Sequence, residues 1–239
     1  MTIIQSLFSA VSGLRTASRS LQTSADNLAN LQTSGFKKSR AVSSDVVSGG
    51  TQISAIIRDS SPGSILTSGS KFDLAIDGEG FFQVSRSGGG TGFTRAGSFR
   101  LDSSGTLVTA NGDALNPAIQ VPAGSTSVSI EPNGLVTATV NGAEVTVGQI
   151  EIATFNNAGG LQAQGGGLFL ETAASGSPVV GVPGVGNAGK VISGVLESSN
   201  VDIAEEVVNQ IVAKTAFKAN ANVIRTAEEM IGTILDIKT

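Results

Sequence analysis

Residues 4–28 read IQSLFSAVSGLRTASRSLQTSADNL, and the spacing of their apolar side chains indicates how the chain begins to fold. Steps of three and four residues alternate along this stretch, which is the heptad pattern of a helix that pairs in a coiled coil. We therefore predict a helix from residue 1 to about residue 32, stopped by Gly35. The apolar positions, here called the N-terminal apolar stripe, are Ile4, Leu7, Val11, Leu14, Leu21 and Leu28, with Ser18 as a polar interruption.

A second helix is predicted at the other end of the chain, over residues 198 to 238. Asn200 or Asp202 can cap its N-terminus, and Glu205 and Glu206 fall in the first turn, where the helix dipole favours acidic groups. Apolar residues again recur in steps of three and four, over a band wider than a strict heptad. We call five of them the C-terminal apolar stripe: Val208, Val212, Val223, Met230 and Ile234.

The middle of the chain indicates β structure, because turn signals rich in Gly, Asn, Asp and Pro recur about every ten residues. The clearest hairpin runs from Val136 to Val147, where Asn141 and Gly142 suit a type I′ turn. Residues 173–189 are rich in Gly, Ala, Ser and Pro, and we expect a long loop there.

The predicted fold class is therefore α+β. Residues 1–35 and 198–239 are expected to form a helical domain in which the two terminal helices pair as a coiled-coil-like bundle. Residues 36–197 are expected to form an all-β domain of many short strands, including extended linker segments.

Composition excludes several classes of function. The 239 residues include no Cys and no His, which removes disulfides, zinc sites built on those residues, and Ser-His-Asp or Cys-His catalysis. A net charge of -4 argues against a nucleic-acid partner. Apolar runs fall far short of the ~18 residues that a membrane span needs, and residues 1–5 lack the basic start of a secretory signal peptide.

The charged residues are divided unevenly between the two ends. Residues 1–40 hold five basic residues against one acidic residue, and residues 197–239 hold seven acidic residues against four basic ones. Two helices of opposite sign are suited to pack together, or against copies of each other, although solvated faces would look the same.

Motifs for chemistry are weak. Residues 184–190 match the first seven positions of a phosphate-binding loop, but Val191 stands where Ser or Thr is needed and a strand, not a helix, is predicted to follow. Two Ser-x-x-Lys matches and the carboxylates Asp73, Asp77 and Glu79 lack the accompanying elements of an active site. We expect no catalytic residue, no cofactor and no metal site.

Several stretches resemble a known family. Residues 27–37, NLANLQTSGFK, resemble the N-terminal signature of the bacterial flagellar rod and hook proteins. Residues 75–82 (AIDGEGFF), 93–99 (FTRAGSF) and 198–202 (SSNVD) are similar to three further family motifs, in the family's order. The motif residues that we single out are Asn27, Ala29, Asn30, Gly35, Phe36, Lys37, Gly78, Gly80, Ser199, Asn200 and Val201.

This resemblance implies a structural subunit of the flagellar axis. Such a subunit would self-assemble into the tubular rod through its terminal helices, as a homo-oligomer in contact with neighbouring rod and hook proteins. The flagellar export apparatus would carry it, without a cleaved signal peptide and without membrane insertion, to the rod that spans the periplasm or to the hook.

Two details bear on its place within the family. Residues 115–122 and 147–155 are most similar to distal rod members, whereas the short stretch between Val42 and Pro62 is common among hook proteins. A hook protein without the large outer domain therefore remains an alternative, and an extracellular β-rich adhesin is another.

Physical reasoning from the stripes agrees with an assembly role. Two helices alone cover little of such apolar faces, and isolated helix pairs are marginal. Neighbouring subunits can supply the missing faces, and a heterologous contact that does not close generates a helical filament. We therefore expect both apolar stripes to form assembly contacts.

Overall fold

The computed structural model describes residues 3–236 of the chain, with side chains for residues 4–233. Within this range, α1 (Ile3–Ala29) and α2 (Ile203–Asp236) confirm both predicted terminal helices. The outermost predicted helical positions, residues 1–2 and 237–238, lie outside the described residues.

Short strands fill the chain between the helices, as predicted. They are β1 (Ser39–Asp45), β2 (Thr51–Arg58), β3 (Ile65–Thr67), β4 (Leu74–Asp77), β5 (Phe81–Ser85), β6 (Thr91–Thr94), β7 (Phe99–Leu101), β8 (Leu107–Thr109), β9 (Ala114–Leu115), β10 (Ser125–Ile130), β11 (Leu135–Val140), β12 (Ala143–Gln149), β13 (Ile152–Thr154), β14 (Gln162–Gly165), β15 (Leu168–Leu170), β16 (Val179–Gly181), β17 (Lys190–Ser193) and β18 (Val195–Glu197), with a 3₁₀-helix η1 (Ala158–Gly160). The α+β class is confirmed.

Contacts divide the chain into two compact units. The first, here called the helical unit, combines the described parts of residues 1–31, 38–59 and 201–239, and the second, the β unit, combines residues 32–37 and 60–200. This division differs from the expected domains, because residues 38–59 group with the helices rather than with the other strands. The physical reason is that these residues form a separate hairpin, in which β1 pairs only with β2 among the described strands.

The helix ends follow local rules. Asp202 Oδ1 accepts hydrogen bonds from Ala204 N at 2.7 Å and Glu205 N at 3.1 Å, so Asp202 rather than Asn200 caps α2. Helix α1 ends at Ala29, earlier than predicted, because Asn30 N and Leu31 N turn back to the carbonyls of Asn27 and Leu28. Gly35, expected to stop the helix, lies beyond this turn.

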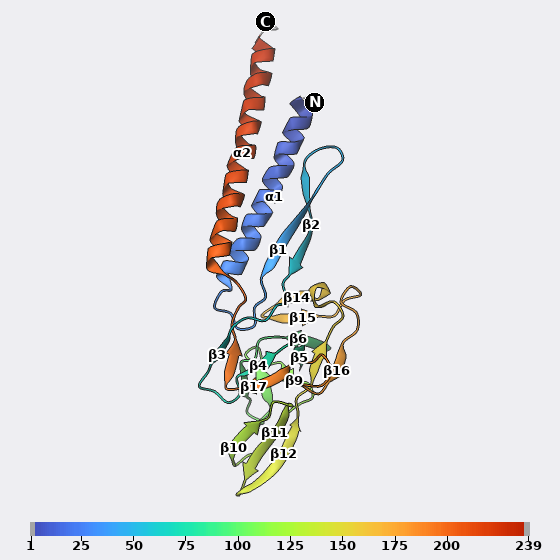
Figure 1. Ribbon diagram of the computed structural model, residues 1–239, viewed down its shortest axis with the longest axis vertical. Coiled ribbons are helices and arrows are strands. Elements are labelled where there is room, and N and C mark those ends of the chain that lie inside the picture. The colour runs from blue at the N-terminus through green and yellow to red at the C-terminus, as the bar shows by residue number, and fades with distance from the viewer. Residues whose placement is uncertain (1–2, 237–239) are drawn as a thin grey trace. The chain divides into compact units, whose positions relative to one another are not determined.

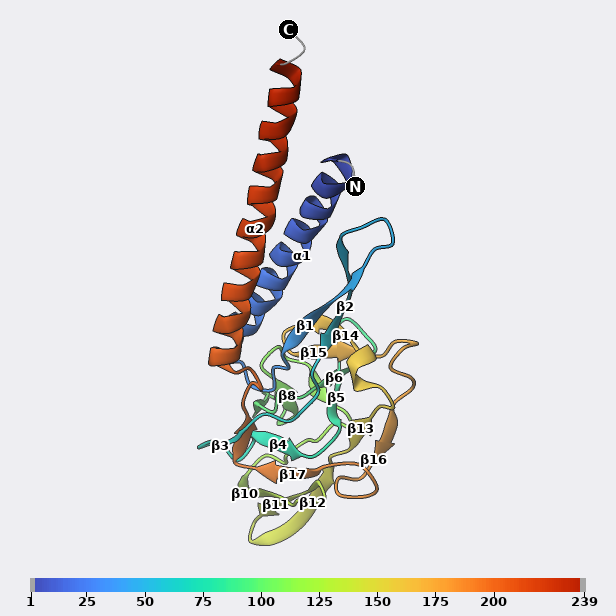
Figure 2. The ribbon, with the colours of Figure 1, turned by 45° about the horizontal axis from the view of Figure 1, so that its top comes forward.

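The two helices pack side by side and antiparallel within the helical unit (Figures 1 and 2). The most buried positions of this contact are not those of the predicted apolar heptad. The contact uses the face one residue earlier, where α1 presents small and polar residues: Ala10, Gly13, Ala17, Ser20, Ser24 and Asn27. A Cβ added to Gly13 would lie 2.7 Å from the Asn220 side chain, so the helices approach closely there.

The predicted pairing of the two helices is confirmed, but the contact is centred on small residues rather than on the apolar stripes. Facing residues on α2 recur every seven positions, at Glu206, Ala213, Asn220 and Ala227. Small side chains let the helix axes come close, and Ser24 Oγ adds a 3.0 Å hydrogen bond to the Glu206 carbonyl oxygen. Both apolar stripes are thereby left beside the contact instead of inside it.

The β1–β2 hairpin lies along α1 on a further side of that helix (Figures 1 and 2). Gln5 Nε2 donates to the Ser48 carbonyl oxygen at 3.2 Å, and Thr51 N donates to Ser12 Oγ at 3.1 Å. The hairpin is therefore held by polar residues of α1, which belong neither to the apolar stripe nor to the small residues that face α2.

The β unit is built around a sheet of nine strands. Its main path runs β14-β15-β6-β5-β9-β8-β7, and β13 joins β5 to β16. Consecutive residues of β5 point to opposite faces, so Phe82 and Val84 enter one hydrophobic cluster while Phe81 enters another with Phe93 and Phe169. Both faces of this sheet are therefore covered by core.

Smaller sheets complete the β unit. Strands β10-β11-β12 form a meander, in which the β11–β12 turn at Asn141 (φ 51°) and Gly142 (φ 82°) confirms the predicted hairpin. Strand β17 pairs with β4, and β18 pairs with β3. Residues 173–189 are not a continuous loop, since Val179–Gly181 forms β16 by pairing with β13.

Candidate assembly surface

Helix α1 exposes large apolar side chains on the face that neither α2 nor the hairpin covers. Ile4 is 65% exposed and Phe8 is 70% exposed. Leu21 is also exposed, and the remaining members of the N-terminal apolar stripe are partly buried: Leu7, Val11, Leu14 and Leu28. Exposed apolar surface of this extent is typical of a binding interface.

Helix α2 exposes a second apolar face. Val208 is 57% exposed, Val212 is 61% exposed, and Val223 and Met230 are 45% exposed. Ile234, the last member of the C-terminal apolar stripe, belongs to α2, but its side chain lies outside the described residues. The described members of this stripe therefore lie on one exposed face of α2, beside the residues that face α1.

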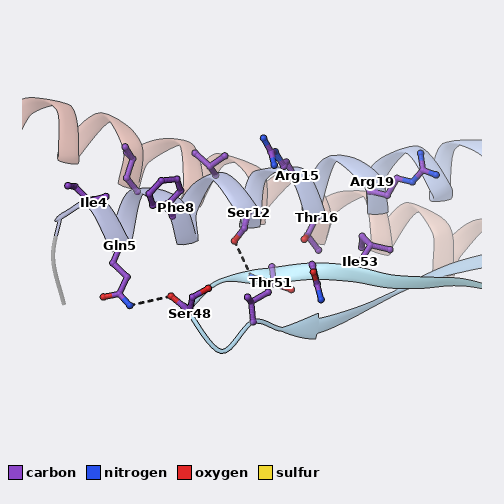
Figure 3. A pocket seen from close by; sticks show the side chains of 15 residues that line it. Ile4, Gln5, Phe8, Ser12, Arg15, Thr16, Arg19, Ser48, Thr51 and Ile53 are labelled. Carbon is purple, nitrogen blue, oxygen red and sulfur yellow. Dashed lines mark hydrogen bonds between the residues drawn. The ribbon is translucent and has the colours of Figure 1, made fainter.

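An open groove of about 950 Å³ runs between α1 and the β1–β2 hairpin (Figure 3). Figure 3 shows Ile4 and Phe8 along α1, with Ile53 of β2 across from Thr16 and Arg19. Three members of the N-terminal apolar stripe line this groove: Ile4, Leu7 and Val11.

The family-motif residue Asn27 ties three segments of the helical unit together. Its Nδ2 donates to Glu206 Oε1 at 2.7 Å and to the Ser39 carbonyl oxygen at 2.8 Å, while its Oδ1 accepts from Ser39 N at 2.8 Å. Only 1% of Asn27 is exposed. One amide side chain therefore fixes the end of α1, the start of α2 and the start of the hairpin.

The motif residue Lys37 belongs to a buried charge cluster in the β unit. Lys37 Nζ lies 2.5 Å from Glu197 Oε1 and donates to the Ser61 carbonyl oxygen at 2.7 Å. Arg95 Nη1 lies 3.4 Å from Glu197 Oε2, and Gly63 N donates to Glu197 Oε1 at 2.9 Å. Glu197 is 1% exposed, so two cations and one backbone N–H group satisfy a buried carboxylate.

Arg95 is held mainly through its terminal nitrogens. Nη2 donates to the Gly78 carbonyl oxygen at 2.7 Å and Nη1 to the Ile76 carbonyl oxygen at 3.2 Å. Its guanidinium carbon lies 5.4 Å from the centre of the Phe81 ring. Burial lowers the pKa of Arg95 from its ordinary value, which the charges of Glu197 and Glu79 oppose.

The motif glycines adopt backbone conformations that other residues rarely reach. Gly35 has φ +68°, and a Cβ there would lie 2.5 Å from the Arg95 carbonyl carbon. Gly78 (φ +120°) and Gly80 (φ +124°) form the turn before Phe81, and a Cβ on Gly80 would collide with Ile152. Both glycines of the predicted 77–80 turn therefore have positive φ.

The other motif residues lie near the two helix ends. Ala29 and Asn30 end α1, where Asn30 Nδ2 donates to the Asp26 carbonyl oxygen at 2.9 Å. Asn200 Nδ2 donates to the Ser61 carbonyl oxygen at 3.1 Å, and Asn200 N donates to the Phe36 carbonyl oxygen at 3.4 Å. Ser199 and Val201 are buried. The signatures around residues 35–37 and 198–200 thus meet in the β unit.

Sequence reasoning missed Glu197 and Glu206 as residues that organise the structure. Each is a charged residue whose partner, Lys37 or Asn27, lies far away in the chain, so no local spacing links them. Arg95 was noticed only as part of a motif. A charged residue at the end of an otherwise apolar strand, as Glu197 is in β18, was the available signal.

The segments that weakly matched catalytic motifs have structural roles. Residues 184–189 form a loop that leads into β17, so no helix N-terminus follows to bind phosphate. Lys37 pairs with Glu197, and Ser68 Oγ donates to Asp73 Oδ2. Within the described residues, no three acidic side chains gather as a metal site, and no helix could span a membrane.

Three segments of the chain match family models of flagellar proteins. Residues 7–37 match the model described as "Flagella basal body rod protein". Residues 75–138 match "Flagellar hook protein FlgE/F/G D1 domain", and residues 192–237 match "Flagellar basal body rod FlgEFG protein C-terminal".

The rod relatives match nearly the full length of the chain. The flagellar basal-body rod protein FlgG of Bacillus subtilis (strain 168) is 38% identical over 264 residues, covering 99% of this chain and 100% of the relative. FlgG of Buchnera aphidicola subsp. Acyrthosiphon pisum (strain APS) is 36% identical over 254 residues, covering 96% and 98%. The flagellar hook protein FlgE of Salmonella typhimurium (strain LT2) is 41% identical over 98 residues, but these cover only 41% of this chain and 24% of the hook protein.

Proposed function

The chain belongs to the flagellar basal-body rod and hook protein family, and we propose that it is the distal rod subunit, which assembles through the apolar stripes of α1 and α2. Its relatives are structural rod proteins, so it is a structural subunit of the flagellar axis. The finer proposal concerns its position in that axis and the surfaces that join its copies.

The observation that carries the proposal is the pair of exposed apolar stripes beside a helix contact made from small residues. Val212 is 61% exposed, while its neighbour Ala213 is 6% exposed. Fully burying an exposed Val, Leu, Ile, Phe or Met side chain contributes about 1.5–3 kcal/mol, which favours packing these stripes against other subunits. The stripes lie beside the α1–α2 contact with much of their surface exposed, and a heterologous contact made through them can continue as a helical filament.

A rod position is favoured over a hook position by the extent of similarity. The rod relatives are covered almost completely, whereas the hook relative is matched over a quarter of its length. A hook protein without a large outer domain is the second candidate, favoured by the short segment between Val42 and Pro62.

The remaining parts of the proposal concern partners and location. The subunit contacts other copies of itself and the rod and hook proteins next to it, and it passes through the flagellar export apparatus. Its net charge of -4 does not favour nucleic acid as a partner. The proposed role requires only binding surfaces and no catalytic residue.

Imaging of basal bodies from a strain that lacks this chain tests the position in the axis. A distal rod subunit is required before the hook, so we expect basal bodies that stop within the rod. Basal bodies with a complete rod and no hook would contradict the rod assignment and support the hook alternative.

Two neighbouring substitutions in that strain test the assembly surface. Val212→Asp changes an exposed residue, so we expect a folded monomer that does not restore rods, because assembly would bury an unpaired charge. Ala213→Asp puts the charge into the α1–α2 contact, and we expect it to disrupt the helical unit itself. Full motility with Val212→Asp would refute a role for this stripe in assembly.

A further inference from the structure

The groove between α1 and the β1–β2 hairpin has the features of a binding site for another helix. Ile4, Phe8 and Val11 line its α1 side, and Val46 and Ile53 line its hairpin side. Its apolar residues remain in contact with water even though the hairpin lies alongside. An open apolar groove of this kind fits the apolar face of an amphipathic helix.

The groove is already formed in the isolated subunit. Two hydrogen bonds, from Gln5 to Ser48 and from Thr51 to Ser12, hold the hairpin against α1 over about two helical turns (Figure 3). A preformed groove binds a helix without the cost of ordering its own walls.

Charge limits which helix can occupy the groove. Arg15 and Arg19 line it on the C-terminal side of Ile4, Phe8 and Val11, and Figure 3 shows both guanidinium groups. Arg19 Nη1 donates to Gln22 Oε1 at 2.8 Å. Among residues 4–233, neither arginine takes part in an ion pair. The groove therefore suits a helix that combines apolar residues with acidic ones.

We propose that the groove binds the C-terminal end of α2 from a second copy of this chain. This end carries Glu228 and Glu229 followed by Met230 and Ile231, all exposed. The inference rests on the proposed function, because it names which surfaces of two subunits meet in the assembly.

The acidic residues at the other end of α2 are already engaged. Glu205 Oε2 lies 3.0 Å from Lys38 Nζ, and Glu206 is buried against Asn27. By contrast, Glu229 has only a 3.9 Å contact with Arg225 on its own helix, with both side chains well exposed. The C-terminal acids are therefore the ones available to the arginines of a neighbour.

The order of residues sets the direction of the pairing. Along α1 the apolar residues precede the arginines, and along the end of α2 the acids precede the apolar residues. Antiparallel helices place apolar against apolar and acid against arginine at the same time. A parallel arrangement would place the acids against Ile4 and Phe8.

The α2 end of the same copy does not occupy its own groove, because α2 packs on a different face of α1. The contact of Gly13 with Asn220 and the hydrogen bond from Ser24 to Glu206 align the helices so that Glu229 lies about level with Ile4 and the backbone of α2 after Ile231 passes the start of α1. Helix α2 has 34 residues and α1 has 27, a difference of about 10 Å in length. Figures 1 and 2 show this projecting end.

Cysteine cross-linking tests the pairing directly, because the natural chain has no Cys. One copy carries Phe8→Cys or Val11→Cys in the groove, the other carries Ile231→Cys, and both are produced together in the strain that lacks the wild-type chain. In isolated basal bodies, mild oxidation is expected to join the two copies. Val208→Cys in place of Ile231→Cys is the matched control, since it exposes an apolar position at the other end of α2.

The expected result is a yield of cross-linked dimer at least about tenfold higher with Ile231→Cys than with Val208→Cys. Equal yields, a higher yield with Val208→Cys, or assembled rods without any dimer would overturn the inference. If a groove variant does not assemble, Ile4→Cys replaces it at the groove's other end. If rods form but no cross-linked dimer is found, the pairing is wrong and the proposed function still stands. If the wild-type chain is not found in isolated rods at all, the proposed function is wrong.

Charge exchange gives an independent readout. Arg15→Glu with Arg19→Glu, or Glu228→Lys with Glu229→Lys, should lower the number of assembled rods about tenfold or more, because like charges would meet. Combining all four changes should restore rods. Lys214→Glu with Lys218→Glu reverses two exposed charges elsewhere on α2 and serves as the control. Failure of the combined variant to improve on either pair, with far-UV circular dichroism unchanged, would refute the ion pairing.

Discussion

Lys37 Nζ and Glu197 Oε1 lie 2.5 Å apart, although 160 positions separate the two residues in the sequence. Both side chains are at most 2% exposed, and Arg95 approaches the other carboxylate oxygen of Glu197. Lys37 follows the end of α1, and Glu197 precedes the start of α2. This cluster therefore joins the two segments through which the chain enters and leaves the β unit.

Glu197→Ala should destabilise the β unit by about 3–5 kcal/mol, because it leaves the buried cations Lys37 and Arg95 without their carboxylate. Urea unfolding followed by circular dichroism measures the change, since the chain has no Trp and no Tyr. Glu144→Ala, at an exposed position of β12, is the control and should change stability by less than about 0.5 kcal/mol. Similar midpoints for the two variants would show that the cluster contributes little.

Asn27→Ala should destabilise the helical unit by about 1–3 kcal/mol. The substitution leaves the backbone groups of Ser39 and the buried carboxylate of Glu206 without a partner. The loss of helical signal with temperature measures the effect, and the exposed neighbour Asp26→Ala is the control. An Asn27→Ala protein with the melting temperature of the wild type would mean that water replaces the hydrogen bonds of the amide without loss of stability.

Gly78→Val and Gly80→Val should each cost about 1–3 kcal/mol through backbone strain, since both positions have positive φ. Gly80→Val should be the more damaging, because its Cβ would also press against the buried side chain of Ile152. Thermal melting of the two variants gives the order. Gly69→Ala, where a Cβ meets no atom within 4 Å, is the control that should melt like the wild type.

Val11→Asp should leave the β unit unchanged and abolish assembly. Val11 lines the open groove, so water can reach a carboxylate there in the monomer, whereas an assembled neighbour would bury it. Ala10→Asp, one residue earlier and 2% exposed, should instead unfold the helix pair before any assembly step. A melting curve and a motility plate for both variants separate the two effects, and a fully motile Val11→Asp strain would contradict the assignment.

The hydrogen bond from Lys38 to Glu205 raises the pKa of Lys38 above its ordinary value. A raised lysine pKa means that the pair stabilises the helical unit below the ordinary lysine pKa and stops doing so as the pH rises through the raised value. Lys38→Met should therefore lower stability at neutral pH by a few tenths of a kcal/mol, since the pair is partly exposed. The difference from wild type should vanish at strongly alkaline pH, and a constant difference would point to packing instead of charge.

Local sequence patterns were sufficient to predict several helices and turns. The apolar periodicity of residues 4–28 predicted α1, Asp202 was one of two proposed caps for α2, and Asn141-Gly142 predicted a type I′ turn. Each of these features depends on residues within one or two turns of each other, which is why the sequence alone was enough. The family motifs also pointed to Asn27, Lys37 and the 77–80 turn before their contacts were known.

Tertiary structure decided which faces of those elements meet. The most buried residues between α1 and α2 are not those of the apolar heptad but small residues one position earlier, which allow a closer approach and leave the apolar stripe beside the contact. The pairing of Lys37 and Arg95 with Glu197, and the grouping of the β1–β2 hairpin with the helices, likewise join distant parts of the chain. Such contacts depend on how whole elements pack in three dimensions, and the spacing of residues along the sequence does not determine that packing.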